Sequence, residues 1–194
     1  GAHGGCVVVS EKYKYLLNGI QKADSVVIDW HKMLLTPALA TALVFRDGNE
    51  AYQTFHQKAQ YLWANQTSTD WFNSGKRTFE CTKYMMSVKI YALLKTQGES
   101  LLTESVDYLY NLARTFAQMI QEHPAFELAV EPESNIVCFR FAGDHAHEAE
   151  VREQLLQKGR FYIVQTVLQN KVHFRVSLMN PLTTEADLHE LLAE

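Results

Sequence analysis

The sequence predicts an α/β fold that is followed by a smaller α+β unit. Three observations lead to this prediction: helical and strand-like segments alternate over the first half, the pattern changes near residue 100, and short strand-like segments gather after it. The chain has 194 residues, of which 47% are hydrophobic and 21% charged, so it can bury a core of ordinary size. Disorder as the main state is therefore excluded.

The first half of the chain has the order helix, strand, strand, helix. Apolar residues at helical spacing predict a helix over 10–23, and Ser10 can cap its start. A β-branched run predicts a buried strand over 25–28, and a second strand is expected over 40–45. A helix over 50–60 completes this part, which resembles the end of an α/β domain.

A polar, turn-rich segment without periodicity follows at 65–76, and it carries the adjacent aromatic residues Trp71 and Phe72. Loops of this length in compact domains are often functional lids, so we expect 65–76 to be a mobile loop. Two helices are then expected, over 80–95 and 101–122.

The rest of the chain predicts an antiparallel sheet with helices on one face. The expected elements are strands over 126–130 and 136–141, a helix over 146–158, a hairpin of strands over 161–168 and 172–178, and a helix from Thr183 or Thr184 to the end. We therefore predict two domains, 1–98 and 99–194.

Charge and hydropathy argue against two classes of partner. The chain has 18 Lys+Arg against 22 Asp+Glu and no basic stripe, whereas a nucleic-acid surface needs clustered Lys and Arg. The longest apolar run, 33–45, is interrupted and is shorter than the roughly 20 residues that span a membrane. Neither nucleic acid nor membrane is expected as a partner.

Potential metal ligands are present but poorly arranged. Cys6, Cys81 and Cys138 form no metal-binding spacing, and their odd number cannot make a closed set of disulfides, which suits a reducing, cytoplasmic location. His145 and His147 are two residues apart at the start of an expected helix and face different directions, so no metal site is expected.

Lys32 is the first candidate for chemistry, because it follows the expected strand 25–28 at the carboxyl end, where open α/β sheets place their active sites. Trp30 before it and the apolar stretch 33–35 after it would desolvate the side chain and favour the neutral amine, a nucleophile toward aldehydes. A structural lysine whose stem covers apolar surface is the alternative, which spacing alone does not exclude.

The segment 23–33, Ala-Asp-Ser-Val-Val-Ile-Asp-Trp-His-Lys-Met, resembles the cofactor-lysine segment of the group II pyridoxal-phosphate-dependent decarboxylases. This is the family of glutamate, aromatic amino acid, cysteine sulfinate and 2,4-diaminobutyrate decarboxylases. Residues 1–5 and 174–181 resemble two further motifs of the same family, so the resemblance covers essentially the whole chain.

The resemblance implies a fold-type I transferase, with 1–98 as the end of the cofactor-binding large domain and 99–194 as the small C-terminal domain. It implies pyridoxal 5′-phosphate as cofactor, an amino acid as substrate and a homodimer. The aspartate that pairs with the cofactor's ring nitrogen would precede Gly1, so we expect the chain to be the C-terminal part of a longer enzyme.

The resemblance also implies roles for four residues. Lys32 would bind the cofactor as a Schiff base, His31 would lie beside its phosphate, and Ala2 would pack against its ring. Arg175 would bind a substrate carboxylate, because a guanidinium pairs with it through two hydrogen bonds. The structural alternatives are a satisfied core histidine at 31 and an ion pair of Arg175 with an acidic side chain.

Two departures from the family pattern bear on the reaction. Asp29 and Trp30 stand where Asn-Pro is commoner, and we assign Asp29 no role. Segment 65–76 contains no tyrosine, although many members carry one there that protonates the product carbon. Either another acid, such as His31 as a catalytic residue or a group outside the chain, donates that proton, or the outcome of the reaction differs. Decarboxylation of an L-amino acid is the expected reaction, while an aldehyde synthase on the same fold and a non-catalytic interaction module are the alternatives.

Overall fold

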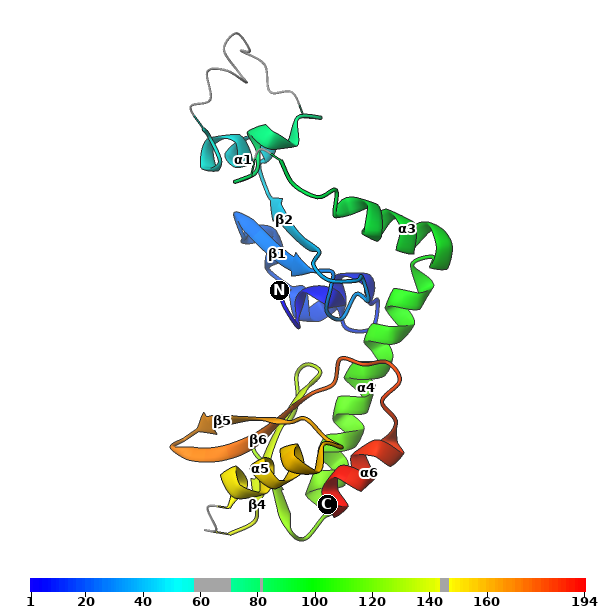
Figure 1. Ribbon diagram of the computed structural model, residues 1–194, viewed down its shortest axis with the longest axis vertical. Helices are drawn as coiled ribbons and strands as arrows, with labels where there is room; N and C mark the ends of the chain where they lie inside the picture. The colour runs from blue at the N-terminus through cyan, green and yellow to red at the C-terminus, as the bar shows by residue number, and fades with distance from the viewer. Residues whose placement is uncertain (58–70, 81, 144–146) are drawn as a thin grey trace. The chain divides into compact units, whose positions relative to one another are not determined.

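In a computed structural model of the chain, the described residues are 1–57, 71–80, 82–143 and 147–194. They form two compact units (Figure 1). The first unit comprises Gly1–Cys6 and Tyr15–Gly98, and the second comprises Val7–Lys14 and Glu99–Glu194. The assignment of 1–98 and 99–194 as a cofactor domain and a small domain stays a prediction.

Two antiparallel strands form the sheet of the first unit: β1 (Ser25–Asp29) and β2 (Thr41–Phe45). Both strands were expected, and their bounds differ from the expected ones by one residue at one end. The segment 30–40 turns back without a crossover helix, and a parallel connection would need one. As a result, the end of β1 lies beside the beginning of β2, with Asp29 opposite Thr41.

The helix expected over 10–23 is also wrong. Two short 3₁₀ turns occupy this stretch instead, η2 (Lys14–Leu17) and η3 (Ile20–Lys22), and a third, η1 (Gly5–Val9), precedes it. Gly19 adopts a left-handed conformation with φ of 97°, which interrupts right-handed helical geometry. The local capping expected of Ser10 is present, because its hydroxyl accepts a 2.9 Å hydrogen bond from the Tyr13 amide.

Helices of the first unit follow the expected order with shifted ends. Helix α1 spans Gly48–Thr54 and is capped by the Asp47 carboxylate, η4 spans Ser74–Lys76, and α3 spans Ser87–Gln97. The start expected for α3 at residue 80 is therefore wrong. Residues 58–60 of the expected second helix and residues 65–70 of the expected loop lie outside the described residues.

The second unit has the expected antiparallel sheet, and its strands lie in the order β3-β4-β6-β5. The strands are β3 (Phe126–Leu128), β4 (Ile136–Phe141), β5 (Val164–Leu168) and β6 (Lys171–Ser177), and the helices are α4 (Ser100–Glu122), α5 (Glu148–Lys158) and α6 (Glu185–Ala193). Gln169 and Asn170 both have positive φ, at 52° and 62°, as a two-residue hairpin turn between β5 and β6 requires.

The core of this unit lies between α4 and the strands β3 and β4. Helix α4 buries a stripe that includes Leu109 and Phe116, and β4 buries Val137 and Phe139 in the alternation of a half-buried strand. The Phe116 and Phe139 rings meet edge to face with centroids 5.5 Å apart, which ties the helix to the sheet.

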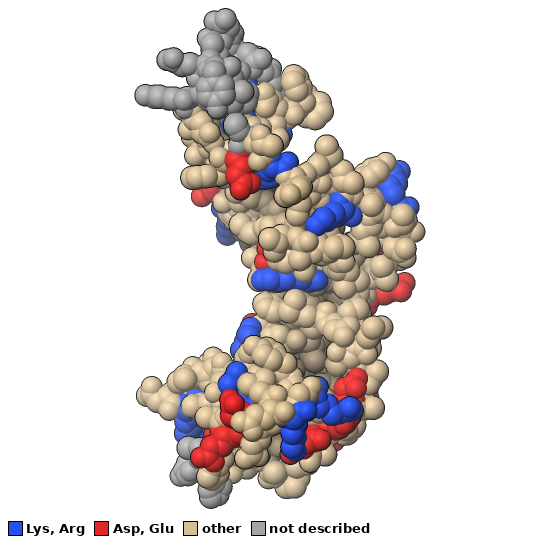
Figure 2. Space-filling view, viewed as in Figure 1, with Lys and Arg blue, Asp and Glu red and all other residues tan. Residues whose placement is uncertain are grey.

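Charged side chains are interspersed on the visible surface of both units (Figure 2). Acidic and basic residues occur near one another on this face, in agreement with the near balance of 18 Lys+Arg against 22 Asp+Glu in the chain. No helix within the described ranges combines the length and apolar character that crossing a bilayer requires.

Candidate active site

Lys32 lies in the turn that leaves β1, three residues beyond the last residue of the strand. Backbone hydrogen bonds from Leu35 N to the Lys32 carbonyl and from Thr36 N to the Trp30 carbonyl hold this turn. The Lys32 side chain is 33% exposed, and its Nζ lies 3.1 Å from Oδ2 of Asp29. The amine is thus close to the protein surface and carries one defined ionic partner.

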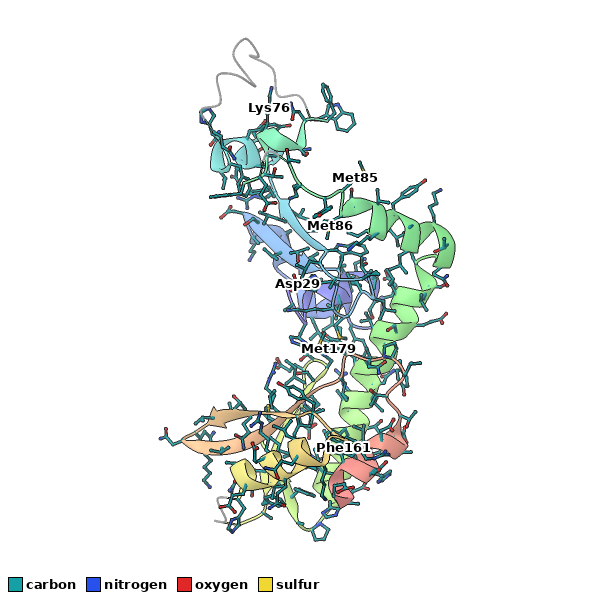
Figure 3. The ribbon with its side chains drawn as sticks, viewed as in Figure 1. Asp29, Lys76, Met85, Met86, Phe161 and Met179 are labelled. Atoms are coloured by element: carbon teal, nitrogen blue, oxygen red, sulfur yellow. The ribbon has the colours of Figure 1, made fainter. Side chains whose placement is uncertain are left out.

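Asp29, which is labelled in Figure 3, is the last residue of β1. Two side chains contact its carboxylate. Thr41 Oγ1 donates a 2.7 Å hydrogen bond to Oδ1, while Lys32 contacts Oδ2. The Thr41 hydrogen bond, followed by the contact with Lys32, holds the pKa of Asp29 below its usual value of 3.8. Asp29, which was assigned no role from the motif, is therefore a carboxylate in contact with Lys32.

His31 is anchored to the start of β2 through one ring nitrogen. Its Nδ1 lies 2.8 Å from the Ala40 carbonyl oxygen and 3.2 Å from the Ala40 amide nitrogen. The same carbonyl accepts hydrogen bonds from the backbone amides of Trp30 and His31. The imidazole is thus held by backbone groups, which limits the directions available to its second nitrogen.

Residues 1–5 lie directly against β1. A Cβ atom on Gly1 would fall 2.0 Å from the Val27 carbonyl oxygen, and one on Gly5 would fall 3.3 Å from Cγ1 of Ile28. At position 1, any residue other than glycine would require the backbone to move away from the Val27 carbonyl. Ala2, with its small side chain, is therefore held next to the strand that leads to Lys32.

These features fit a flat aldehyde cofactor such as pyridoxal phosphate. Such a group needs an accessible amine for its aldehyde. The partly exposed Lys32 meets this need. Ala2 belongs to the same unit of the structure, and its packing against the cofactor ring stays a prediction. Within the described ranges, no group of three or more metal-ligating side chains is found, and the candidate His145 lies outside those ranges.

Arg175 lies in the second unit, on the inner strand β6 between β4 and β5. Its cross-strand neighbours are Cys138 and Val164. Burial raises the pKa of the Cys138 thiol, and the positive charge of Arg175 opposes that shift. Among the carboxylates that the structure describes, none forms an ion pair with Arg175, so the structural alternative for this residue finds no partner there.

Arg77 braces the described end of segment 65–76. Its Nη2 donates a 2.5 Å hydrogen bond to the Trp71 carbonyl, and its guanidinium lies 5.6 Å from the centroid of the Tyr52 ring. The side chain thereby links residues 71–77 to helix α1 by a cation–π contact.

Thr41 is the residue of this site that sequence reasoning missed. Its position in a strand expected over 40–45 gave no functional signal by itself. The signal lies in the pairing of the strands, because Asp29 and Thr41 are direct cross-strand partners and Lys32 follows Asp29 by three residues. A correct antiparallel register would have revealed the contact.

Comparison with known proteins gives one family. Residues 1–142 match the model of the pyridoxal-dependent decarboxylase conserved domain. Cysteine sulfinic acid decarboxylase of Mus musculus is 29% identical over 211 residues, which cover 100% of this chain and 43% of that protein. Aspartate 1-decarboxylase of Aliivibrio fischeri is 30% identical over 225 residues, covering 100% of this chain and 40% of that protein.

The fold agrees with the sequence comparison. A crystal structure of the mouse cysteine sulfinic acid decarboxylase, CSAD, matches with a TM-score of 0.86 and 28% identity, over 100% of this chain and 43% of that one. The fold-type I expectation is therefore confirmed. The chain spans less than half the length of these relatives.

Proposed function

The chain belongs to the pyridoxal-dependent decarboxylase family, and from this we propose that the full protein removes the α-carboxylate of an L-amino acid as carbon dioxide and releases the amine. The observation that carries the proposal is the accessible Lys32 amine in the turn after β1, within the residues that match the family. Pyridoxal 5′-phosphate, when bound, supplies an electron sink for the electron pair left on the α-carbon.

Each candidate residue has one task in this proposal. Lys32 Nζ would be the nucleophile toward the cofactor's aldehyde carbon. His31, which is anchored through Nδ1 to the Ala40 carbonyl, would lie beside the phosphate. Ala2 would pack against the ring, where a larger side chain would displace it. Arg175 binds a substrate carboxylate with the two parallel N–H groups of its guanidinium.

The proposal also concerns which amino acid is the substrate. A glutamate- or 2,4-diaminobutyrate-type enzyme is our expectation from the sequence motifs, while the relatives reported above are named for cysteine sulfinic acid and aspartate. Three of these four amino acids are acidic, which suits a cationic Arg175 as the group that receives a carboxylate. A homodimer and a cytoplasmic location complete the proposal.

The test is a screen of the full-length protein, loaded with pyridoxal phosphate, against acidic, basic and aromatic amino acids. Equal amounts of carbon dioxide and amine from one class support decarboxylation. The matched variant Lys32→Ala should show neither product. Full activity of Lys32→Ala would contradict the assignment of the lysine.

An aldehyde synthase is the second candidate, favoured by the absence of a tyrosine from 65–76. It would consume dioxygen and water and release carbon dioxide, ammonia, hydrogen peroxide and an aldehyde, without the matching amine. The same screen separates the two reactions when peroxide is measured beside the amine. If the full-length protein binds no pyridoxal phosphate and turns over no amino acid, a non-catalytic interaction module becomes the better account.

A further inference from the structure

We propose that Leu35 is a positioning residue for Lys32: its left-handed backbone, and not its side chain, closes the turn that holds the lysine amine in place. This inference rests on the proposed function of Lys32. Leu35 itself is given no contact with cofactor or substrate, because it acts through the backbone of the turn 32–35.

The backbone of Leu35 has an unusual conformation. Its φ is 58°, in the left-handed region that a Cβ atom disfavours and that leucine, unlike glycine or asparagine, rarely adopts. Among the described residues other than glycine, Gln169 and Asn170 are the only others with positive φ, and a two-residue hairpin turn accounts for them. A strained residue persists only where its surroundings hold it, so the contacts around Leu35 should explain its conformation.

Two backbone hydrogen bonds close the chain around Leu35. The Leu35 amide donates a 3.1 Å hydrogen bond to the Lys32 carbonyl, and the Thr36 amide donates one of 2.9 Å to the Trp30 carbonyl. A left-handed residue at the end of such a turn reverses the direction of the chain, and glycine usually occupies that position. The Trp30 amide in turn donates a 2.9 Å hydrogen bond to the Ala40 carbonyl, so the turn is also tied to the residue before β2.

Burial of the neighbouring side chains fixes the orientation of the turn. Met33 and Leu34 are 0% exposed and Thr36 is 3% exposed, whereas the Lys32 side chain is 33% exposed. The buried neighbours stabilise the turn and offset the cost of the left-handed residue. Of these four side chains, that of Lys32 is therefore the one that a reactant can approach.

The position of the amine matters for bond formation. Lys32 Nζ must meet an aldehyde carbon at a defined distance and angle to form the C–N bond, and its two protons leave with the aldehyde oxygen as water. If the turn opens, the amine samples positions away from that carbon and the reaction slows. A residue at position 35 that cannot hold a left-handed backbone should therefore slow the attachment of the cofactor.

The test uses the full-length protein after removal of the cofactor. Pyridoxal phosphate is added at fixed pH, and the rate of its covalent attachment is measured by borohydride trapping and mass spectrometry. Leu35→Gly and Leu35→Asn, which tolerate positive φ, should react within about twofold of the unmodified protein. Leu35→Ile, which is branched at Cβ, should react about tenfold more slowly.

Hydrogen exchange of the peptide that covers 30–36 is the second readout, in the same cofactor-free protein. The amides of residues 35 and 36 donate the two hydrogen bonds that close the turn, so their exchange should be faster in Leu35→Ile and unchanged in Leu35→Gly. Slower attachment in Leu35→Ile without faster exchange would contradict the role of the turn.

A role of the leucine side chain in packing predicts the opposite order, because isoleucine keeps the volume that glycine removes. Slower attachment in Leu35→Gly than in Leu35→Ile would therefore overturn the inference. If Leu35→Ile fails to fold, as judged by circular dichroism, Leu35→Gly carries the test alone. Attachment slowed beyond about twofold would then overturn the inference, and a rate within that range would support it.

Gln169→Ile is the matched control, because it places the same branched residue at a left-handed position, with φ of 52°, in the turn between β5 and β6 of the other unit. It should leave the attachment rate unchanged, and slowing equal to that of Leu35→Ile would overturn the inference while Lys32 keeps its role. Attachment at full rate in Lys32→Ala would instead overturn the proposed function, and the inference with it.

Discussion

Asp29 and Thr41 face each other across the β1–β2 pair, and the Thr41 hydroxyl donates a 2.7 Å hydrogen bond to Oδ1 of Asp29. The contact joins the end of one strand to the start of the other. It also holds in place the carboxylate that binds Lys32, so one hydroxyl connects the stability of the sheet to the position of the candidate cofactor lysine.

Thr41→Val should lower the free energy of unfolding by about 1 kcal/mol near neutral pH, because a hydrogen bond to a charged group is lost while the side-chain volume is kept. Thr41→Ser retains the hydroxyl and should cost less. Urea unfolding of the full-length protein measures both, and equal losses in the two variants would contradict the role of the hydrogen bond.

The loss of stability in Thr41→Val should depend on pH. Because the folded-state pKa of Asp29 lies below its usual 3.8, the carboxylate stabilises the fold at pH above 3.8. This contribution is lost as the pH falls through the lower folded-state pKa. The difference in unfolding free energy between the unmodified protein and Thr41→Val should therefore be greatest near neutral pH and shrink in acid.

Arg175→Met should raise the KM for the amino acid substrate by about tenfold or more, because bidentate pairing with a carboxylate is lost. Arg175→Lys keeps the charge but not the two parallel N–H groups, so it should recover only part of the affinity. Lys171→Met on the same strand is the control. Steady-state kinetics test the role, and an unchanged KM in Arg175→Met would exclude it.

Phe116→Ala should destabilise the second unit by about 3–5 kcal/mol, because the ring is fully buried against Phe139 and its removal leaves a cavity. Val167→Ala, at a position on β5 that is 64% exposed, should change stability by about 0.5 kcal/mol or less. Denaturant unfolding provides the comparison. Similar losses in the two variants would argue against a core at the α4–β4 contact.

Thr184→Ala should loosen the start of α6. Thr184 and Asp187 form a reciprocal capping box, in which the Asp187 amide donates to Thr184 Oγ1 and the Thr184 amide donates to Asp187 Oδ2. The loss should cost about 1 kcal/mol, seen as faster hydrogen exchange of the first α6 amides. Thr183→Ala is the neighbouring control, and equal exchange in both variants would contradict the assignment of the cap.

Local chemistry made much of the second unit predictable. The hairpin turn at Gln169 and Asn170 and the helix cap at Thr184 each depend on residues that are close in sequence. A few neighbouring residues are therefore enough to predict each of them. The α4 helix is also strongly patterned, with an apolar stripe over its length. These elements agree with the expected ones to within a few residues at their ends.

The first unit was less predictable because two local details override the periodic pattern. Gly19 divides a helical pattern into 3₁₀ turns, and the turn after Trp30 reverses the chain so that β1 and β2 pair antiparallel. The candidate lysine was found from its motif context. The Asp29–Thr41–Lys32 contact depends on strand register, which single-residue patterns do not encode.

The central claim, that Lys32 is the lysine that bonds to the cofactor, has a direct test. The full-length protein is loaded with pyridoxal phosphate, reduced with borohydride, digested and analysed by mass spectrometry, with Lys32→Ala and Lys89→Ala treated alongside. Lys32 should carry the reduced cofactor in the unmodified protein and in Lys89→Ala, and Lys32→Ala should carry none. Label on another lysine, or undiminished labelling of Lys32→Ala, would contradict the account.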